Sequence, residues 1–86
     1  MKKGYAEVKE WFINKQSEKA TRYNCFIDIY SRDENGKVES VDGYLKVLFQ
    51  EVISETEKAV YVVLGTGNAD GSYKGWKTWI PKSVIK

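Results

Sequence analysis

The feature that most constrains the fold is a pair of apolar segments joined by a short polar turn. Residues 44–53, YLKVLFQEVI, carry apolar side chains at the two-residue period of a β-strand. The shared apolar face of this segment is predicted to hold Leu45, Val47, Phe49 and Ile53. Residues 59–64, AVYVVL, are apolar throughout, which is typical of a strand covered on both faces. Because only the polar residues 54–58 separate the two segments, the sequence predicts an antiparallel hairpin.

An earlier hairpin is predicted upstream of this one. Residues 25–30, CFIDIY, alternate at strand period and contain β-branched and aromatic side chains. The dipeptide Asn35-Gly36 follows, and it tolerates the positive φ angles of a type I′ turn. The returning strand is interrupted at Asp42-Gly43, which we interpret as a bulge or a second turn.

The C-terminal segment, YKGWKTWIPKSVIK, is predicted to end the fold as a strand, a turn and a short closing strand. Alternation assigns one face of the first strand to Trp76, Thr78 and Ile80, and the other face to Lys77 and Trp79. Pro81 lacks the backbone N–H that a strand ladder needs, so the strand ends there. A tight turn at residues 82–83 then leads into residues 84–86.

Residues 80–85, IPKSVI, resemble the end of SH3-like barrels, where a similar passage crosses from one sheet to the other. This resemblance implies an SH3-like architecture and carries no peptide-binding activity with it. The segments EKAVYVVL and WIPKSVI are also similar to the ends of small uncharacterised proteins from phages and mobile elements. That second similarity implies no function.

Residues 5–20, YAEVKEWFINKQSEKA, are compatible with two structures. One face of a helix over this range would hold Tyr5, Val8, Trp11 and Phe12. Its alanine, glutamate, lysine and glutamine residues also favour a helix, which would cover an open end of the barrel. The alternative is a strand and turn, because residues 12–20 resemble residues 52–59 once one residue is inserted.

We therefore expect one domain over residues 1–86 that is mainly β, either a small SH3-like barrel or a strongly bent antiparallel sheet, with an N-terminal helix. The alternative is an α+β fold with one helix packed on an antiparallel sheet. The one cysteine, Cys25, cannot form an internal disulfide, which favours a reducing compartment. Since no segment has the length of apolar sequence that spans a membrane, we expect a cytoplasmic protein without membrane association.

The usual catalytic side chains are scarce in this chain. It contains no histidine, so neither a Ser–His nor a Cys–His nucleophile can be assembled, and no zinc ligand set is available. The glycine-rich residues 65–75 precede a predicted strand instead of a helix, and they lack the Gly-Lys-Ser/Thr sequence of a phosphate-binding loop. We expect a protein that is not an enzyme and binds no cofactor and no metal.

Positive charge and aromatic rings both concentrate near the C-terminus. Residues 58–86 carry a net charge of +4, whereas residues 1–57 carry a net charge of −2. Exposed rings can stack on bases while lysines follow the phosphates of a single strand. The predicted residues of a single-stranded nucleic-acid site are Tyr73, Lys74, Lys77, Trp79 and Lys82. In the structural alternative, both tryptophans belong to the core.

A second hypothesis is a protein–protein interaction module or inhibitor of phage or mobile-element origin. Aromatic residues serve protein interfaces as well as they serve nucleic acids, and the net charge of +2 is small for a nucleic-acid-binding protein. An open sheet edge would also allow a homodimer. Salt dependence discriminates between the two hypotheses, because only phosphate contacts release counterions.

Overall fold

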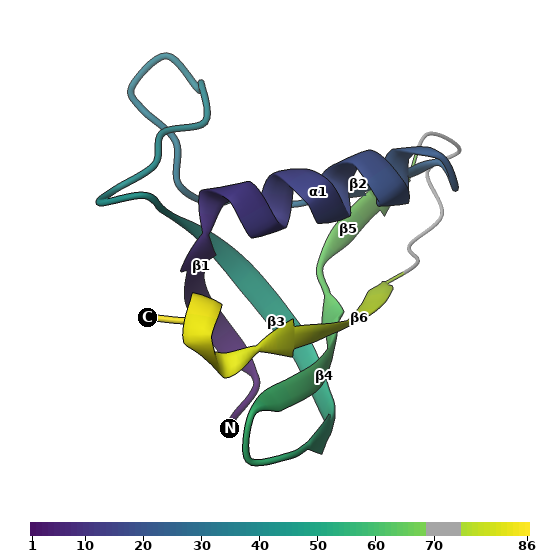
Figure 1. Ribbon diagram of the computed structural model, residues 1–86. Helices are drawn as coiled ribbons and strands as arrows, with labels where there is room; N and C mark the ends of the chain where they lie inside the picture. The colour runs from purple at the N-terminus through teal and green to yellow at the C-terminus, as the bar shows by residue number, and fades with distance from the viewer. Residues whose placement is uncertain (69–74) are drawn as a thin grey trace.

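The computed structural model describes residues 1–68 and 75–86 of the chain (Figure 1). Its elements are β1 (Gly4–Lys9), α1 (Glu10–Thr21), β2 (Cys25–Ile27), β3 (Tyr44–Glu55), β4 (Ala59–Leu64), β5 (Thr66–Asn68), β6 (Trp76–Pro81) and the 3-10 turn η1 (Lys82–Val84). The strands form a four-stranded sheet in the order β1-β3-β4-β6 and a two-stranded sheet of β2 and β5, with every pairing antiparallel. The prediction of a mainly β fold with a helix near the N-terminus is confirmed. The sheets do not close into a barrel.

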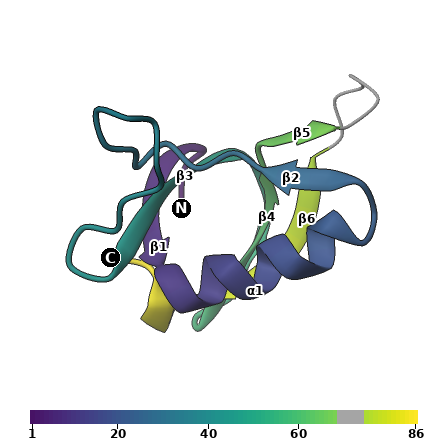
Figure 2. The ribbon, with the colours of Figure 1, turned by 90° about the horizontal axis from the view of Figure 1, so that it is seen from above.

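The core lies between the curved four-stranded sheet and α1. Seen from above, the strands curve around the core and α1 lies along the side that they leave open (Figure 2). Strand residues supply most of the buried set, which comprises Val8, Leu45, Val47, Phe49, Val60, Val62, Leu64 and Ile80, while α1 contributes Ile13 and Ala20. This burial is the main stabilising contribution, because apolar area removed from water drives the folding of such a small domain.

Strand β3 departs from the predicted pattern in its second half. Its pairing with β4 shifts register twice, between Phe49 and Glu51 and again between Val52 and Ser54. Each extra residue reverses the faces of those that follow, so Val52 packs against the core and Ile53 is 44% exposed. The hairpin of β3 and β4 was predicted correctly, but the assignment of Ile53 to the core face was wrong.

The type I′ turn forms at Asp42-Gly43 instead of Asn35-Gly36. Asp42 has a φ of 55° and Gly43 a φ of 79°, and the flanking residues 41 and 44 exchange two backbone hydrogen bonds of 3.0 Å. Both central residues therefore have the positive φ that a type I′ turn requires. At the earlier dipeptide only Gly36 has a positive φ, of 79°.

A side chain organises that earlier turn. Asp33 Oδ1 accepts hydrogen bonds of 2.9 Å from the backbone N–H groups of Asn35 and Lys37. This is the local capping that aspartate provides in turns, and it replaces the type I′ geometry predicted from the dipeptide alone.

The predicted partner of β2 was also wrong. We expected residues 25–30 to pair with the segment returning after Gly36, but β2 pairs with β5, opposite residues 66–68. The returning segment contributes isolated bridges such as that between Arg32 and Val38. Sequence patterns identify a strand more readily than its distant partner, since pairing depends on the packing of the whole domain.

The N-terminal segment forms both a strand and a helix, the two structures that its sequence left open. Residues 4–9 form β1, paired in continuous register with residues 44–49 of β3, and the helix begins only at Glu10. The predicted helix was therefore too long at its start. Because the chain turns after β1, the helix buries Ile13, Gln16 and Ala20, whereas Trp11 is exposed. Tertiary pairing outweighs helix propensity over residues 5–9.

The C-terminal segment follows the predicted order of strand, turn and closing residues. Strand β6 ends at Pro81, η1 makes one 3-10 turn, and Ile85 then bridges to Val8 of β1. The backbone N–H of Lys86 donates a 2.9 Å hydrogen bond to the carbonyl of Glu7. The last residues therefore attach the C-terminus to the edge of β1.

Within the part of the chain that the structure describes, no helix is both long enough and apolar enough to cross a membrane.

Candidate functional site

Three of the five predicted site residues lie in the described structure, namely Lys77, Trp79 and Lys82, whereas Tyr73 and Lys74 lie outside the described residues. Trp79 is 47% exposed on the outer side of β6, and Lys77 is exposed on the same strand. The Trp79 ring stacks on that of Tyr61, its direct partner on β4, with centroids 5.1 Å apart and planes at 29°. We call Tyr61, Lys77 and Trp79 the tryptophan face.

The other tryptophan of this strand has a structural role. Trp76 packs partly buried against the core, and its Nε1–H donates a 3.0 Å hydrogen bond to Oε1 of the buried Gln16 on α1. The predicted division of the strand into an inner side with Trp76 and Ile80 and an outer side with Lys77 and Trp79 is confirmed. Trp76 therefore joins the helix to the sheet.

Lys82 is engaged in an ion pair beside the tryptophan face. Its Nζ lies 2.6 Å from Glu55 Oε2, and the N-terminal amine contacts the other carboxylate oxygen. The hydrogen bond from Lys82, followed by that from the amine, lowers the pKa of Glu55 from its ordinary value of 4.5 to about 2. Lys82 is thus already paired with a carboxylate.

The lysines around the tryptophan face are equalled in number by glutamates. Among the described residues of the second half of β3, the β3–β4 turn, β6 and η1, Lys58, Lys77 and Lys82 are matched by Glu51, Glu55 and Glu57. Glu51 lies in the same cross-strand row as Lys77, since both are register partners of Val63. A polyanion would meet as many carboxylates as lysines in this part of the surface.

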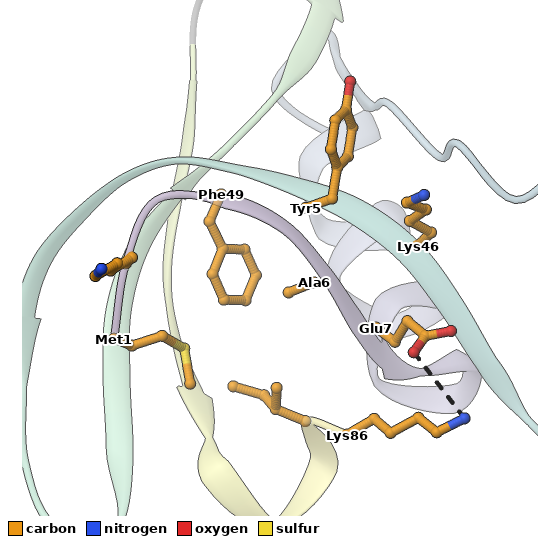
Figure 3. Close-up of a pocket in the computed structure, with 9 residues that line it drawn as sticks. Met1, Tyr5, Ala6, Glu7, Lys46, Phe49 and Lys86 are labelled. Carbon is orange, nitrogen blue, oxygen red and sulfur yellow. Dashed lines mark ion pairs between the residues drawn. The ribbon is translucent and has the colours of Figure 1, made fainter.

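A pocket of about 500 Å³ lies along β1, the edge strand opposite β6 in the order of the four-stranded sheet (Figure 3). It is lined by Met1, Lys2, Tyr5, Ala6, Glu7, Lys46, Phe49, Ile85 and Lys86. The lining includes apolar side chains and three lysines, Lys2 near the N-terminus, Lys46 on β3 and Lys86 at the C-terminus. Three lysines against one carboxylate make this lining net positive.

Strand alternation explains why the pocket has both kinds of lining. Ala6 and its register partner Val47 point toward the core side of the sheet, whereas Tyr5 and Glu7 point to the other side. Lys46 is the direct partner of Glu7 on β3. The pocket therefore spans the edge of β1, from the apolar inner side to the polar outer side.

Aromatic rings continue this outer side beyond the pocket. Tyr5, which is 59% exposed, meets Tyr30 edge to face with centroids 4.9 Å apart. Lys46 Nζ lies 5.2 Å from the Tyr5 ring centroid, and the backbone N–H of Tyr30 donates to the Lys46 carbonyl. Lys86 Nζ lies 5.6 Å from the Tyr44 ring centroid. We call Tyr5, Tyr30, Tyr44, Lys46 and Lys86 the tyrosine–lysine face.

The sequence prediction missed the tyrosine–lysine face. Tyr5 was placed in a segment expected to form the N-terminal helix, and Lys46 was given no role. Alternation does place Tyr44 and Lys46 on one side of β3, but the register that adds Tyr5 and Tyr30 joins segments far apart in the chain. The sequence therefore indicates the part of this face on β3, but not the residues that other segments add to it.

Comparisons with known proteins add no family and no relative. No protein-family model matches the chain, and neither a curated protein nor a solved structure matches it. Across residues 1–68 and 75–86, no group of three or more His, Cys, Asp or Glu side chains is placed to hold a metal ion.

Proposed function

We propose that this protein is a non-enzymatic binding domain for single-stranded nucleic acid, with the tyrosine–lysine face and its pocket as the binding surface. The observation that carries the proposal is the combination, at one edge of the sheet, of three lysines against one carboxylate with two exposed tyrosine rings. Lysines that follow phosphates and rings that stack on bases are the two components of single-strand binding without strong sequence preference.

Tyr5 is suited to stacking although Lys46 lies over its ring. An exposed cation–π contact contributes about 0.5–1 kcal/mol, whereas a base stacked on an aromatic ring contributes about 1–3 kcal/mol. A base can therefore replace Lys46 on Tyr5, and the displaced ammonium group can turn to the adjacent phosphate. This exchange needs no movement of the backbone.

The tryptophan face is the second candidate, and its chemistry favours a protein partner. Its lysines are balanced by carboxylates, and Lys82 is paired with Glu55 at 2.6 Å. An exposed aromatic pair next to the exposed Ile53 is typical of the apolar centre of a protein interface. Nucleic-acid binding through Tyr73, Lys74, Lys77, Trp79 and Lys82 stays a prediction.

The end of the chain supports an SH3-like arrangement as the finer description of the fold. Strand β6, the 3-10 turn η1 and the bridge from Ile85 to Val8 follow one another as the resemblance implies. Small open β-folds of this size are common platforms for nucleic acids. The single buried cysteine supports the proposal of a reducing, cytoplasmic location.

The test is a fluorescence-anisotropy titration of the protein into a labelled single-stranded oligonucleotide at several salt concentrations. We expect affinity to fall as salt rises, and Lys46→Gln to lower the slope of log K against log salt by about 0.7, the contribution of one phosphate contact on a single strand. Lys77→Gln is the matched control, because it removes the same charge from the tryptophan face. It should leave both affinity and slope unchanged.

Either of two results would contradict this proposal. The first is the absence of binding at low salt, which moves the search to protein partners. The second is an equal loss in the two lysine variants, which indicates a diffuse charge effect without a defined face. Thermal melting of both variants confirms that each is folded, as expected for exposed lysines.

A further inference from the structure

The pocket beside β1 combines two chemistries that one type of small ligand shares. Its lining is apolar at Ala6, Phe49 and Ile85 and cationic at Lys2, Lys46 and Lys86. We propose that the pocket is a subsite for a single nucleotide, with the base against the apolar part of its lining and the phosphate beside Lys86. This inference rests on the proposed function and specifies which part of the strand the domain holds most closely.

The lining of the pocket supports a flat ligand of this size. Phe49 is only 1% exposed, so the accessible apolar lining comes from the partly buried Ala6 and Ile85. Both pack against the core, which makes this lining rigid. A volume of about 500 Å³ lies within the range of small-ligand sites, of about 300–1,000 Å³. One nucleotide fits such a space, whereas a longer segment would extend out of it.

Lys86 can leave its present ion pair to bind a phosphate. Lys86 Nζ lies 4.0 Å from Glu7 Oε2, and both side chains are about half exposed. Exposed pairs of this kind contribute little, so Lys86 can exchange Glu7 for a phosphate at small cost. Figure 3 shows this ion pair as a dashed line between Glu7 and Lys86.

Glu7 also has a role consistent with this ligand. A carboxylate accepts hydrogen bonds but donates none, so it would repel a phosphate and accept from the amino group of a base or from a ribose hydroxyl. Its position opposite Lys46 across the β1–β3 pair gives the pocket one acceptor beside its cations. A phosphate bound by Lys86 would therefore replace Glu7 as the partner of this lysine, and the released carboxylate could accept a hydrogen bond from the base or the ribose.

The pocket and the tyrosine–lysine face form one continuous surface. Tyr5 lines the pocket and also contacts Tyr30 on the outer side of the sheet. A strand anchored by one nucleotide in the pocket would place its next bases over these two rings. The subsite therefore predicts that a mononucleotide binds by itself, and that a longer strand adds stacking contacts to the same anchor.

The experiment is an NMR titration of the 15N-labelled protein with a nucleoside 5′-monophosphate, using the matching nucleoside and inorganic phosphate as separate probes. We expect about millimolar affinity for the monophosphate, as is ordinary for a small ligand in a partly open site. The amide signals of Tyr5, Ala6, Glu7 and Phe49 should shift, and those of Lys77 and Trp79 should not. The nucleoside and phosphate should each bind about tenfold or more weakly than the monophosphate.

Two variants test where the base and the phosphate of the nucleotide bind. Ala6→Leu adds bulk to the lining of the pocket and should abolish the monophosphate shifts, whereas Lys86→Gln leaves the apolar lining unchanged and should weaken binding about tenfold. The amide spectrum of each free variant reports whether it is folded. If Ala6→Leu does not fold, Lys86→Gln and the three probes still decide whether the pocket binds a nucleotide.

The outcomes separate this inference from the proposed function. Oligonucleotide binding without monophosphate shifts at the pocket would overturn the subsite and leave the function standing. Equal affinity for the nucleoside and the monophosphate would overturn the placement of the phosphate. Failure of both the oligonucleotide and the monophosphate to bind would overturn the function and the subsite together.

Discussion

The tyrosine–lysine face lies mainly on β1 and β3 and the tryptophan face on β4 and β6 of the same sheet, and the two faces differ in how their charges are satisfied. Each contains a pair of contacting rings, 4.9 Å apart in Tyr5 and Tyr30 and 5.1 Å apart in Tyr61 and Trp79. At the first face the lysines lie over rings and outnumber the nearby carboxylate. At the second, Lys82 is held by Glu55. Aromatic and basic residues therefore define a nucleic-acid surface only when their cross-strand neighbours leave the positive charge uncompensated.

The comparison of two exposed faces fails if Trp79 belongs to the core. Measuring the free energy of unfolding tests this, and of our predictions it has the largest expected effect. Phe49→Ala removes a side chain that is 1% exposed and should lower the free energy of unfolding by about 3–5 kcal/mol. Trp79→Ala removes an exposed ring from one stacked pair and should cost about 1 kcal/mol. Urea denaturation of both variants measures the difference.

Ile53→Ala is the control for that measurement. Ile53 is as exposed as Trp79 but lies in the bulged part of β3. Its replacement should change stability by about 0.5 kcal/mol or less. If Trp79→Ala instead destabilises the protein as much as Phe49→Ala does, the tryptophan face is part of the core and the comparison of two exposed faces is wrong.

Measurements of single-strand affinity also compare the two faces, and their expected effect is smaller than that on stability. Tyr5→Ala removes the exposed ring of the tyrosine–lysine face and should weaken single-strand binding by about 1–3 kcal/mol, the contribution of one stacked base. Tyr5→Phe keeps the ring and should retain most of the affinity. Trp79→Ala should leave binding unchanged, and the same anisotropy titration measures all three variants. A loss in Trp79→Ala that matches the loss in Tyr5→Ala would return the binding site to the C-terminal strand.

The parts of the fold that were predicted correctly depend on residues close together in the chain. The hairpin of β3 and β4, the outward position of Trp79 and the strand end at Pro81 all follow from alternation or from the chemistry of one residue. Local patterns of this kind are present in the sequence whatever the rest of the fold does. These local patterns predicted the outward position of Lys77 and Trp79, but not the balance of charge around them.

The parts that were predicted wrongly depend on contacts between distant segments. The pairing of β1 with β3, the pairing of β2 with β5 and the bulge that exposes Ile53 cannot be seen in any single segment. The same is true of the site. Counting lysines along the chain predicted a basic C-terminal surface, whereas the register places Glu51 in the same cross-strand row as Lys77 and brings Lys46 to Tyr5. Charge along the chain and charge on the folded surface are different quantities in a sheet.

The smallest expected effect tests whether Glu55 holds Lys82 beside the tryptophan face. The hydrogen bonds from Lys82 and the N-terminal amine lower the pKa of Glu55 to about 2 from 4.5, so its ionised form is favoured in the folded protein. A lowered carboxyl pKa stabilises the fold above the unfolded value, and this contribution is lost as pH falls through the folded value. The melting temperature of Glu55→Gln should therefore lie slightly below that of the unsubstituted protein at pH 7, and the gap should narrow below about pH 4.5 and close near pH 2. Glu57→Gln removes the same charge from the neighbouring turn and should not reproduce this pH dependence. A gap that stays constant from pH 7 to pH 2 would mean that the Glu55 carboxylate does not hold Lys82, and Lys82 would then be free to add positive charge to the tryptophan face.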